Sequence, residues 1–431
     1  MVSVNVEGNG AMGDQHGKLG ANRPSMTRRG LIAAATTGYA ALVTKPRARA
    51  ASAGLRIGVL TDMSGYSADV SGIGSVLAAR MAAETFGGTS CGGPIQVLAG
   101  DHQNKADIGA AVARQWCASG VDVVVNVNNS AVALAVNEIT RQENKILLAT
   151  GPGTTRLTGD ACSPNTVHWS FDNYALAHGT ATAVVRAGGD TWSFLTADFA
   201  FGIDLEAQAA RVVEARHGRV LSRVRVPSQS ADFSSYLLQV QSSRSKVIGF
   251  AMTAGDLQNA VKQAVEFGMA DGGQQLACLL AFITDIHGLG LQVAQGLRLT
   301  EGFYWNLNPA TRAWSLRFAE RQRAGARPTM TQAGDYAAVL HTLKAIEQLG
   351  TSTDGAAVVA GMKVMPTDDP LFGQGTIRAD GRKLHDMHLF QVKTPSESAE
   401  PWDYYKVLAT IPAAEAFRPL EEGNCPMIGH T

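Results

Sequence analysis

The sequence has little of several features that would mark a specialised protein class. Its 431 residues include five cysteines, too few for a small scaffold held together by disulfides. Lys and Arg total 37 and are matched by 37 Asp and Glu, whereas nucleic-acid-binding proteins carry a basic surplus. No apolar run after residue 50 reaches the length of about 18 residues that a membrane helix needs. We therefore expect no nucleic-acid partner and no membrane span beyond residue 50.

Sequence motifs of enzymes and cofactor sites are also missing. The run that starts at Gly72-Ile-Gly74 lacks the third glycine of a dinucleotide fingerprint, and it does not directly follow a strand. Phosphate-loop, zinc-protease and nucleophile-elbow motifs are absent. His385 and His388 would point to opposite faces of a strand, so they do not form a metal pair. We predict no enzyme activity, no cofactor and no metal.

What the sequence does contain is a regular alternation of apolar strands and helical segments. With 45% hydrophobic residues and this length, two globular domains are expected. Continuous apolar strands between helices indicate parallel sheets that are covered on both faces. The strands are expected at 55–60, 95–99, 121–125 and 145–149, and in a second series at 168–171, 191–196, 219–226, 247–251 and 276–280. The pattern predicts an α/β fold with two doubly wound βα lobes.

The C-terminal part of the chain, from residue 313 on, follows a different pattern. Helices are expected at 313–323 and 336–349, followed by strands at 376–378 and 388–392. The Asp380-Gly381 pair between these strands is a hairpin signal.

The first fifty residues are predicted to be a leader and not part of the fold. Arg28-Arg29 precedes an apolar stretch at 31–43, and Ala48-Arg49-Ala50 has the small-x-small pattern of a cleavage site. The apolar stretch is too short to cross a bilayer, which takes about 20 residues. We interpret 1–50 as a twin-arginine export signal. The alternative is a loose basic tail, and Ala51-Ser52-Ala53 is a second possible cleavage site.

Candidate binding residues follow the ends of the predicted strands. In open α/β sheets, ligands bind outside the carboxyl ends of the strands. The residues found there are mainly hydroxyls, amides, glycines and aromatics, as expected for a site that holds a small molecule with polar ends. The candidates are Tyr66, His102, Asn129, Ser130, Thr150, Gly151, Phe201, Thr253 and Asp285.

The Asn129-Ser130 pair lies where a helix is expected to begin. Free backbone N–H groups and the positive end of the helix dipole make such a position suitable for an anion. Asn129 or Ser130 could instead simply cap the helix, and the two roles are compatible. Thr150-Gly151 could add a hydroxyl and an amide, or it could be an ordinary turn between a strand and a helix.

The cysteines allow two disulfides in an oxidising compartment. Cys91 and Cys117 lie at the ends of one strand–helix unit, so a bond between them is feasible. Cys162 and Cys425 could tie down the C-terminal tail, and Cys278 is expected to be a buried free thiol. The spacing alone does not decide the pairing.

Four stretches carry a resemblance to a known family: residues 56–62, 101–105, 199–202 and 369–373. They resemble type I periplasmic solute-binding proteins of ABC importers, in the family of the Leu/Ile/Val-binding proteins. Within that family the chain is most similar to a branch that takes up aromatic carboxylic acids. The resemblance implies two lobes joined by three crossing strands near residues 171, 302 and 363. Lobe 1 would then comprise 51–171 and 303–362, and lobe 2 would comprise 172–302 and 363–431.

The resemblance also implies a role for individual residues. A ligand carboxylate would lie at Asn129-Ser130 and at the turn Thr150-Gly151. Phe201 stands where amino-acid binders often have Tyr, and Asp285 is the nearest candidate for the acidic partner of an ammonium group.

The function implied is that of a periplasmic, monomeric protein that delivers a small carboxylate to the membrane permease of an ABC importer. An aromatic acid such as a hydroxybenzoate or a cinnamate is the preferred ligand. The alternatives are a branched-chain amino acid or amide binder, or a sensor, of the same fold.

Overall fold

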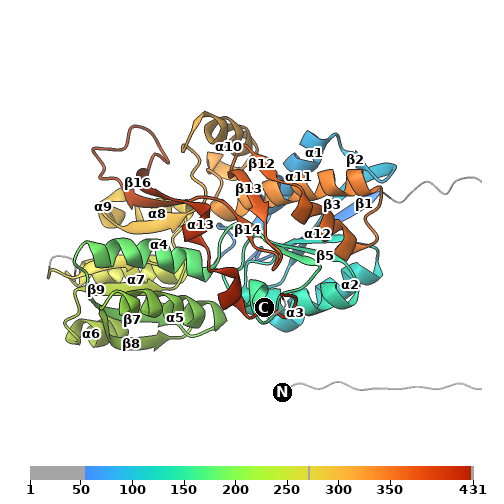
Figure 1. The fold of residues 1–431 in the computed structure, drawn as a ribbon. Helices are drawn as coiled ribbons and strands as arrows, with labels where there is room; N and C mark the ends of the chain where they lie inside the picture. Colours follow the sequence, from blue (N-terminus) through green and yellow to red (C-terminus); the bar gives the residue numbers. More distant parts are fainter. Residues whose placement is uncertain (1–53, 270–271, 429–431) are drawn as a thin grey trace, which may run out of the picture. The chain divides into compact units, whose positions relative to one another are not determined.

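The computed structural model describes residues 54–269 and 272–428 (Figure 1). The predicted export signal at 1–50 lies outside the described residues. The described chain contains two large sheets and a small third one. This is the α/β fold with two doubly wound lobes that the alternation of strands and helices predicts.

The first sheet has six strands in the order β2-β3-β1-β4-β5-β6. All neighbours run parallel except β2, which pairs with β3 in antiparallel orientation. The strands are β1 (Leu55–Thr61), β2 (Thr89–Ser90), β3 (Gly93–Asp101), β4 (Val123–Asn126), β5 (Ile146–Ala149) and β6 (Thr166–His168). The last strand ends earlier than the predicted run at 168–171.

Strand side chains of the first sheet alternate between two apolar layers. Val59 and Val125 pack toward the helices α1 and α11, whereas Leu60 and Val124 pack toward α2 and α3. Successive side chains of a strand point to opposite faces of the sheet, and both faces are apolar. The strands therefore appear in the sequence as continuous hydrophobic runs. The helices are α1 (Gly72–Phe86), α2 (Ala106–Ala118), α3 (Ser130–Gln142), α11 (Met330–Leu349) and α12 (Gly355–Val364).

The second sheet has seven strands in the order β16-β15-β11-β10-β9-β7-β8. The strands from β8 to β11 run parallel, and β15 and β16 complete the sheet in antiparallel orientation. The strands are β7 (Thr191–Ala197), β8 (Arg219–Val226), β9 (Val247–Ala251), β10 (Gln275–Cys278), β11 (Arg298–Glu301), β15 (Met387–Val392) and β16 (Tyr405–Ile411).

Helices of the second lobe connect these strands. They are α4 (Asn173–Arg186), α5 (Ala200–Ala215), α6 (Ser234–Ser242), α7 (Ala254–Glu266), α8 (Ile283–Leu289) and α9 (Leu291–Ala294). Helix α10 (Pro309–Arg321) follows the second sheet, and α13 (Ala413–Ala416) follows β16.

The small third sheet corrects the prediction for the C-terminal hairpin. It contains β12 (Thr367–Asp369), β13 (Gly373–Ile377) and β14 (Lys383–Leu384) in antiparallel order. The turn at Asp380-Gly381 forms, but it joins β13 to β14, whereas the predicted strand at 388–392 lies in the second sheet as β15. Asp380 closes the turn by pairing with Arg378, so the chain returns at once beside β13.

The same hairpin lies beside the first sheet. The His168 N–H donates to the Gly381 carbonyl at 2.9 Å, and the backbones of His168 and Arg382 form an isolated parallel β-bridge. The prediction assigned everything after residue 363 to lobe 2. Gly381 and Arg382 lie against β6 of the first sheet, and the chain joins the second sheet at β15.

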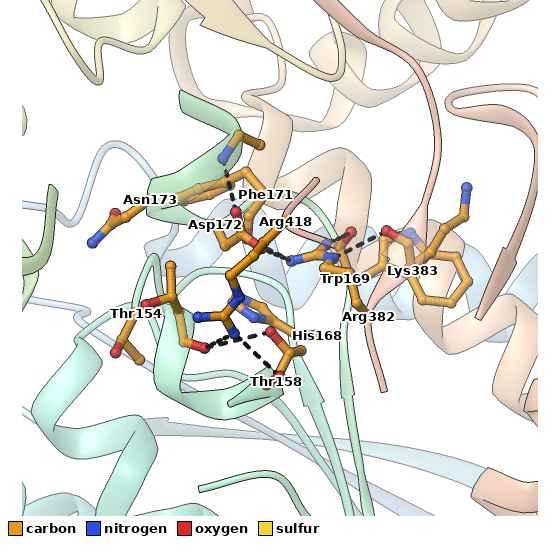
Figure 2. Close-up of polar contacts among 12 residues, drawn as sticks. Thr154, Thr158, His168, Trp169, Phe171, Asp172, Asn173, Arg382, Lys383 and Arg418 are labelled. Atoms are coloured by element: carbon orange, nitrogen blue, oxygen red, sulfur yellow. Dashed lines mark hydrogen bonds and ion pairs between the residues drawn. The ribbon is translucent and has the colours of Figure 1, made fainter. Parts of the chain in front are cut away.

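The segments that connect the two large sheets lie together around a buried arginine (Figure 2). Arg382 donates to the Phe171 carbonyl at 2.9 Å and to the Trp169 carbonyl, and it lies 3.6 Å from the Asp172 carboxylate. At Gly302 an added Cβ would lie 2.6 Å from His385 Nε2, so a second and a third connection also touch. The hinge is therefore a packed bundle of three segments.

One of the two predicted disulfides is present. Cys162 is bonded to Cys425, with a Cα–Cα distance of 5.6 Å, so the C-terminal tail is attached to the first lobe. Cys278 is a buried free thiol, as predicted, but the predicted bond between Cys91 and Cys117 does not form. Cys91 packs on the α1 side of the first sheet and Cys117 on the α2 side, so the sheet separates them.

Candidate ligand-binding cleft

Each large sheet has a point at which its strand order reverses. In the first sheet β1 lies between β3 and β4, and in the second sheet β7 lies between β8 and β9. Consecutive connections leave such a point in opposite directions, which opens a crevice at the carboxyl ends of the strands. The loops after β1, β4, β7 and β9 are therefore the positions where the fold itself makes room for a ligand.

A cavity lies where these loops meet. About 30 Å³ of it can hold the centre of a water molecule, which is room for very few atoms. None of the residues that line it carries a charged side chain. From the first lobe they are Tyr66, Ser67, Val70, Asn128, Ser130, Gly151 and Gly153; from the second they are Phe199, Phe201, Thr253, Leu280 and Phe282.

Asn128 organises the wall that the first lobe contributes. Its Oδ1 accepts hydrogen bonds from the Asp62 N–H at 3.0 Å and from Thr61 Oγ1 at 3.1 Å. The same oxygen is 2.9 Å from His102 Nε2, and Asn128 Nδ2 donates to Ser67 Oγ at 3.1 Å. The prediction selected the neighbouring Asn129 and missed Asn128.

Two left-handed residues explain why Asn128 reaches the cleft. Asn126 has φ 81° and Val127 has φ 53°, a region that β-branched residues rarely adopt. The Val127 N–H donates to the Leu60 carbonyl at 2.9 Å, and its side chain is buried between the sheet and the helices α2 and α3. The surrounding structure thus holds the strained turn that presents Asn128.

Asn129 caps helix α3 and does not line the cleft. Its Oδ1 accepts from the N–H groups of Ala131 at 3.0 Å and Val132 at 3.2 Å. Ser130 is the first residue of the helix, lies at the cleft and is 1% exposed. Its hydroxyl oxygen has no hydrogen-bond partner in the described chain. The capping role foreseen for this pair therefore belongs to Asn129, and Ser130 is the member of the pair that lines the cleft.

Thr150 is turned away from the cleft, contrary to the prediction. Its hydroxyl donates to the carboxylate of Asp335, a buried residue of α11. Asn126 Nδ2 donates to both oxygens of this carboxylate, at 3.0 and 3.2 Å. Burial raises the pKa of Asp335 to about 7, although its hydrogen bonds act in the opposite direction. Gly151, the partner of Thr150 in the prediction, does line the cleft.

His102 supports the first wall from behind. It was predicted as a ligand residue, but it is fully buried and does not line the cleft. The Asn104 N–H donates to its Nδ1 at 3.0 Å, which leaves Nε2 as the ring donor to Asn128. Burial lowers the pKa of His102 and favours this neutral ring.

The wall from the second lobe is aromatic. Phe199 and Phe201 have ring centroids 5.9 Å apart, and Phe282 packs edge-on against Phe171 of the hinge at 6.1 Å. Gly153 of the first lobe lies so close to Phe201 that an added Cβ would be 3.0 Å from the ring. Thr253, which precedes α7, has a buried hydroxyl without a partner in the described chain. Phe201 and Thr253 were both predicted from their place after a strand.

Asp285 is not available at the cleft as an ammonium partner. It is fully buried, accepts from the Phe282 N–H at 2.9 Å and from Gln258 Nε2 at 2.9 Å, and does not line the cavity. Burial raises its pKa to about 6. Asp285 therefore holds the backbone that carries Phe282.

Direct contacts join the two lobes beside the cavity. Thr155 of the first lobe donates to the Asp204 carboxylate of α5 through its N–H at 3.0 Å and its hydroxyl at 3.1 Å. Tyr66 lies against the start of α7, where an added Cβ on Gly255 would be 3.8 Å from the Tyr66 Cβ. Burial, with Asp256 and Asp62 nearby, raises the pKa of the Tyr66 phenol, which stays protonated. The lobes are in a closed arrangement.

No helix within 54–269 and 272–428 is long and apolar enough to span a membrane. That part of the chain also brings together no group of three or more His, Cys, Asp or Glu that could hold a metal ion.

Comparison with known proteins identifies the family. The family model described as periplasmic binding protein matches residues 54–399. A periplasmic binding protein from Burkholderia mallei is 48% identical, with a TM-score of 0.84 over 86% of this chain and 98% of that chain. A branched chain amino acid ABC transporter periplasmic ligand-binding protein from Burkholderia xenovorans LB400 is 36% identical, with a TM-score of 0.77 over 86% of this chain and 99% of that chain.

More distant structures are similar in fold alone. A solute binding protein of an ABC transporter from Rhodopseudomonas palustris HaA2, in complex with p-hydroxybenzoic acid, is 20% identical. Its TM-score is 0.76 over 83% of this chain and 97% of that chain. No curated protein matches the chain significantly. The resemblance expected from the sequence is confirmed: the chain belongs to the periplasmic binding protein family, and it is a solute-binding protein of an ABC transporter.

Proposed function

We propose that the cleft binds a small aromatic carboxylate, such as a hydroxybenzoate or a cinnamate, and that the closed protein delivers it to the permease. The observation that supports this proposal is that the two lobes line the cavity with residues of different chemistry. Hydroxyl, amide and glycine groups line one side, and Phe199, Phe201 and Phe282 line the other. A flat ring with a carboxylate at one end has the matching chemistry, because its ring can stack while its charged end accepts hydrogen bonds.

The carboxylate would be held without a cationic side chain. The starts of α3, α5 and α7 all lie at the cleft, through Ser130, Phe201 and Thr253. Helix N-termini offer unbonded N–H groups and the positive end of the helix dipole. The unpartnered hydroxyls of Ser130 and Thr253 would add one donor from each lobe.

A branched-chain amino acid is the second candidate, because the relative from Burkholderia xenovorans is described as a branched chain amino acid transporter component. An amino acid carries an ammonium group that needs an acidic or carbonyl partner. The lining residues include no Asp or Glu, and Asp285 is engaged by Phe282 and Gln258. This lack of an acidic side chain favours the aromatic acid.

Binding requires the lobes to open, because the closed cavity is far smaller than the 300 Å³ or so of typical small-molecule sites. Opening around the three-segment hinge would expose both walls, and closing would remove the ligand from water. The closed surface, which spans both lobes, is the form that we propose the permease recognises.

Calorimetric titration of refolded, ligand-free protein tests the proposal. We expect 4-hydroxybenzoate or cinnamate to bind more tightly than leucine or isoleucine, and benzyl alcohol, which lacks the carboxylate, to bind far more weakly. At 100 times Kd a ligand should stabilise the fold by about 2.7 kcal/mol. Ser130→Ala should weaken the binding of the aromatic acid by about tenfold or more, because hydrogen bonds to charged groups are worth about 1.5–3 kcal/mol. Tighter binding of leucine than of every aromatic acid would overturn the proposed ligand class.

We also propose that the chain reaches the periplasm by the twin-arginine route and acts there as a monomer. The support is the Arg28-Arg29 pair ahead of an apolar stretch and the Ala48-Arg49-Ala50 pattern. N-terminal sequencing of the native protein should give a start near Ala51. A mature protein that still carries Arg28 and Arg29 would contradict the export prediction, and sedimentation analysis tests the monomer.

A further inference from the structure

A second cavity lies on the second lobe, away from the cleft. Its volume is about 380 Å³, within the range of small-molecule sites. We call it the α4 pocket. Helix α4, the outer strands β15 and β16 and the segment that follows β16 enclose it, and it shares no lining residue with the cleft.

A polar stripe of α4 forms one side of this pocket. Tyr174, His178, Thr182 and Arg186 are spaced four residues apart, so they lie in a row along one face of the helix. The rings of Tyr174 and His178 stack, with centroids 5.4 Å apart and planes at 10°. The stacked pair gives the pocket a flat surface beside its polar groups.

The part of the lining that comes from β15, β16 and the tail is mainly apolar, with Thr410 and Glu415 as its polar residues. Leu389 comes from β15, Ile411 from the end of β16, and Phe417 from the tail that leads to Cys425. A ligand with a hydrophobic body could therefore lie between this part of the lining and the α4 stripe, and it would remove apolar surface from water.

Two arginines give the pocket a positive charge. Arg186 ends α4, and Arg216 lies just after α5. Neither forms an ion pair within 4.0 Å in the part of the chain that the structure describes, whereas Arg321, for example, is 2.6 Å from Glu84. Glu415, which is exposed, is the acidic residue of the lining. Burial lowers the pKa of His178 most; Arg216 and Arg186 lower it further and Glu415 raises it, so these three charges act on the same space.

A buried hydroxyl points to a missing partner in the same place. Thr182 is 9% exposed, and its Oγ1 is buried without a hydrogen-bond partner among the described residues. Such a group costs free energy unless something bonds to it. Thr182 lies one helical turn from both His178 and Arg186, so a single small ligand could reach the hydroxyl and a guanidinium.

From these features we propose that the α4 pocket is a second binding site, for a flat organic anion. The anionic group, a carboxylate or sulfonate, would lie against Arg216 and Arg186 and accept from Thr182 Oγ1. The flat body would lie between the Tyr174–His178 pair and Phe417. This site is independent of the ligand proposed for the cleft, because no lining residue is shared.

Fluorescence titration with 1-anilinonaphthalene-8-sulfonate, a flat aromatic anion that brightens in apolar sites, tests the proposal. We expect one saturable site in the full chain. Arg216→Gln and Thr182→Val should each weaken binding by about tenfold or more, and their combination with Arg186→Gln should abolish it. Arg211→Gln is the matched control, since Arg211 is exposed on α5 and lies outside the pocket lining. It should leave the titration unchanged, and melting temperatures confirm that each variant is folded.

Three results would overturn the proposal. Equal binding by the wild type and the triple variant would place the probe elsewhere. Loss of binding in Ser130→Ala with retention in Arg216→Gln would place it in the cleft. Displacement of the probe by inorganic sulfate at the same concentration as by naphthalene sulfonate would show a simple anion site and exclude the flat body.

Discussion

The two walls of the cleft differ in how their atoms are held in place. On the first-lobe wall, Asn128 binds several neighbouring groups, and Asp62 behind it does the same, so hydrogen bonds hold the polar atoms of this wall in place. On the second-lobe wall, Phe199, Phe201 and Phe282 are fixed by packing, and the Thr253 hydroxyl is unpartnered. The first-lobe wall is organised for directional hydrogen bonds, and the second-lobe wall provides apolar surface for packing against a ligand.

This difference indicates an order of events in binding. A hydrogen-bonding wall that is already organised can hold a carboxylate while the cleft is open to water. An aromatic wall contributes most after closure, because its gain depends on removing apolar surface from water. We infer that the ligand binds to the first lobe and that the second lobe then closes on its ring, as in other two-lobed binding proteins that close at a hinge.

A buried carboxylate supports each wall. Asp335 accepts from Thr150 and Asn126 beneath the first, and Asp285 accepts from the Phe282 N–H beneath the second. Burial raises the pKa of both, to about 7 and about 6. Both walls are therefore supported by a buried carboxylate, although their surfaces differ in chemistry.

The largest effect is expected from Asn128→Ala. It would leave the Asp62 N–H, Thr61 and His102 without their common acceptor and so disorganise the whole first wall. An unsatisfied buried group costs about 1–3 kcal/mol, so we expect aromatic-acid affinity to fall by about a hundredfold or more. Calorimetric titration measures the change.

Asn129→Ala is the matched control for Asn128. It removes the cap of α3 and should cost about 1 kcal/mol of stability, with a change in affinity below about threefold. An equal loss of affinity in both variants would mean that the helix start, and not the Asn128 network, holds the ligand.

The second prediction concerns pH and the buried Asp335. Its pKa is about 7 in the folded protein against about 3.9 in an unfolded chain. Between these values the folded state holds a proton that the unfolded state has lost. The stability contributed by this group is therefore complete below pH 4 and declines as the pH rises toward 7. The slope for one proton is about 1.4 kcal/mol per pH unit.

The Asp335→Asn variant isolates the contribution of Asp335 ionisation to the pH dependence of stability. The variant cannot titrate, so its stability relative to wild type should increase as the pH rises from 4 to 7 and stay constant above pH 7. Urea denaturation across this range gives the difference directly. A constant difference over the whole range would show that Asp335 has an ordinary pKa.

The third prediction tests the aromatic wall. Phe201→Leu keeps most of the apolar volume but removes the ring that faces the cleft and packs near Phe199. Aromatic pairs contribute about 0.5–1.5 kcal/mol beyond their area, so binding of 4-hydroxybenzoate should weaken by about fivefold. Phe267→Leu, at an exposed position outside the cleft, is the control and should have no effect. A Phe201→Leu variant with full affinity would remove ring stacking from the proposal.

The order of strands and helices was accessible from the sequence because buried parallel strands are continuous apolar runs. Tyr66, Ser130, Gly151, Phe201 and Thr253 were found at the cleft for a related reason: the ends of parallel strands mark the ligand edge. β16 was missed because it is an edge strand, with Val407 and Leu408 about half exposed, and it lacks a buried run.

The directions in which loop side chains point could not be predicted from the sequence. Because of the left-handed turn at Asn126 and Val127, Asn128 faces the cleft and Asn129 caps the helix. No residue type in that run predicts such a turn. Asp285 and Thr150 are engaged by partners that are distant in sequence or buried in the fold, such as Gln258 and Asp335. Such pairings depend on packing between elements, which a pattern along one chain does not contain.

The smallest effect on binding is expected from Thr150→Val, which separates support of the wall from contact with the ligand. The hydroxyl donates to Asp335 and not into the cleft, so the affinity for an aromatic acid should change by less than about threefold. Stability should fall by about 1–3 kcal/mol near pH 8, where Asp335 is ionised and loses a donor. The loss should shrink below pH 6, where a protonated Asp335 needs that donor less. Paired titrations and urea denaturation at pH 5.5 and 8 give both quantities. A tenfold loss of affinity together with unchanged stability would return Thr150 to the ligand site and reverse the assignment of the first wall.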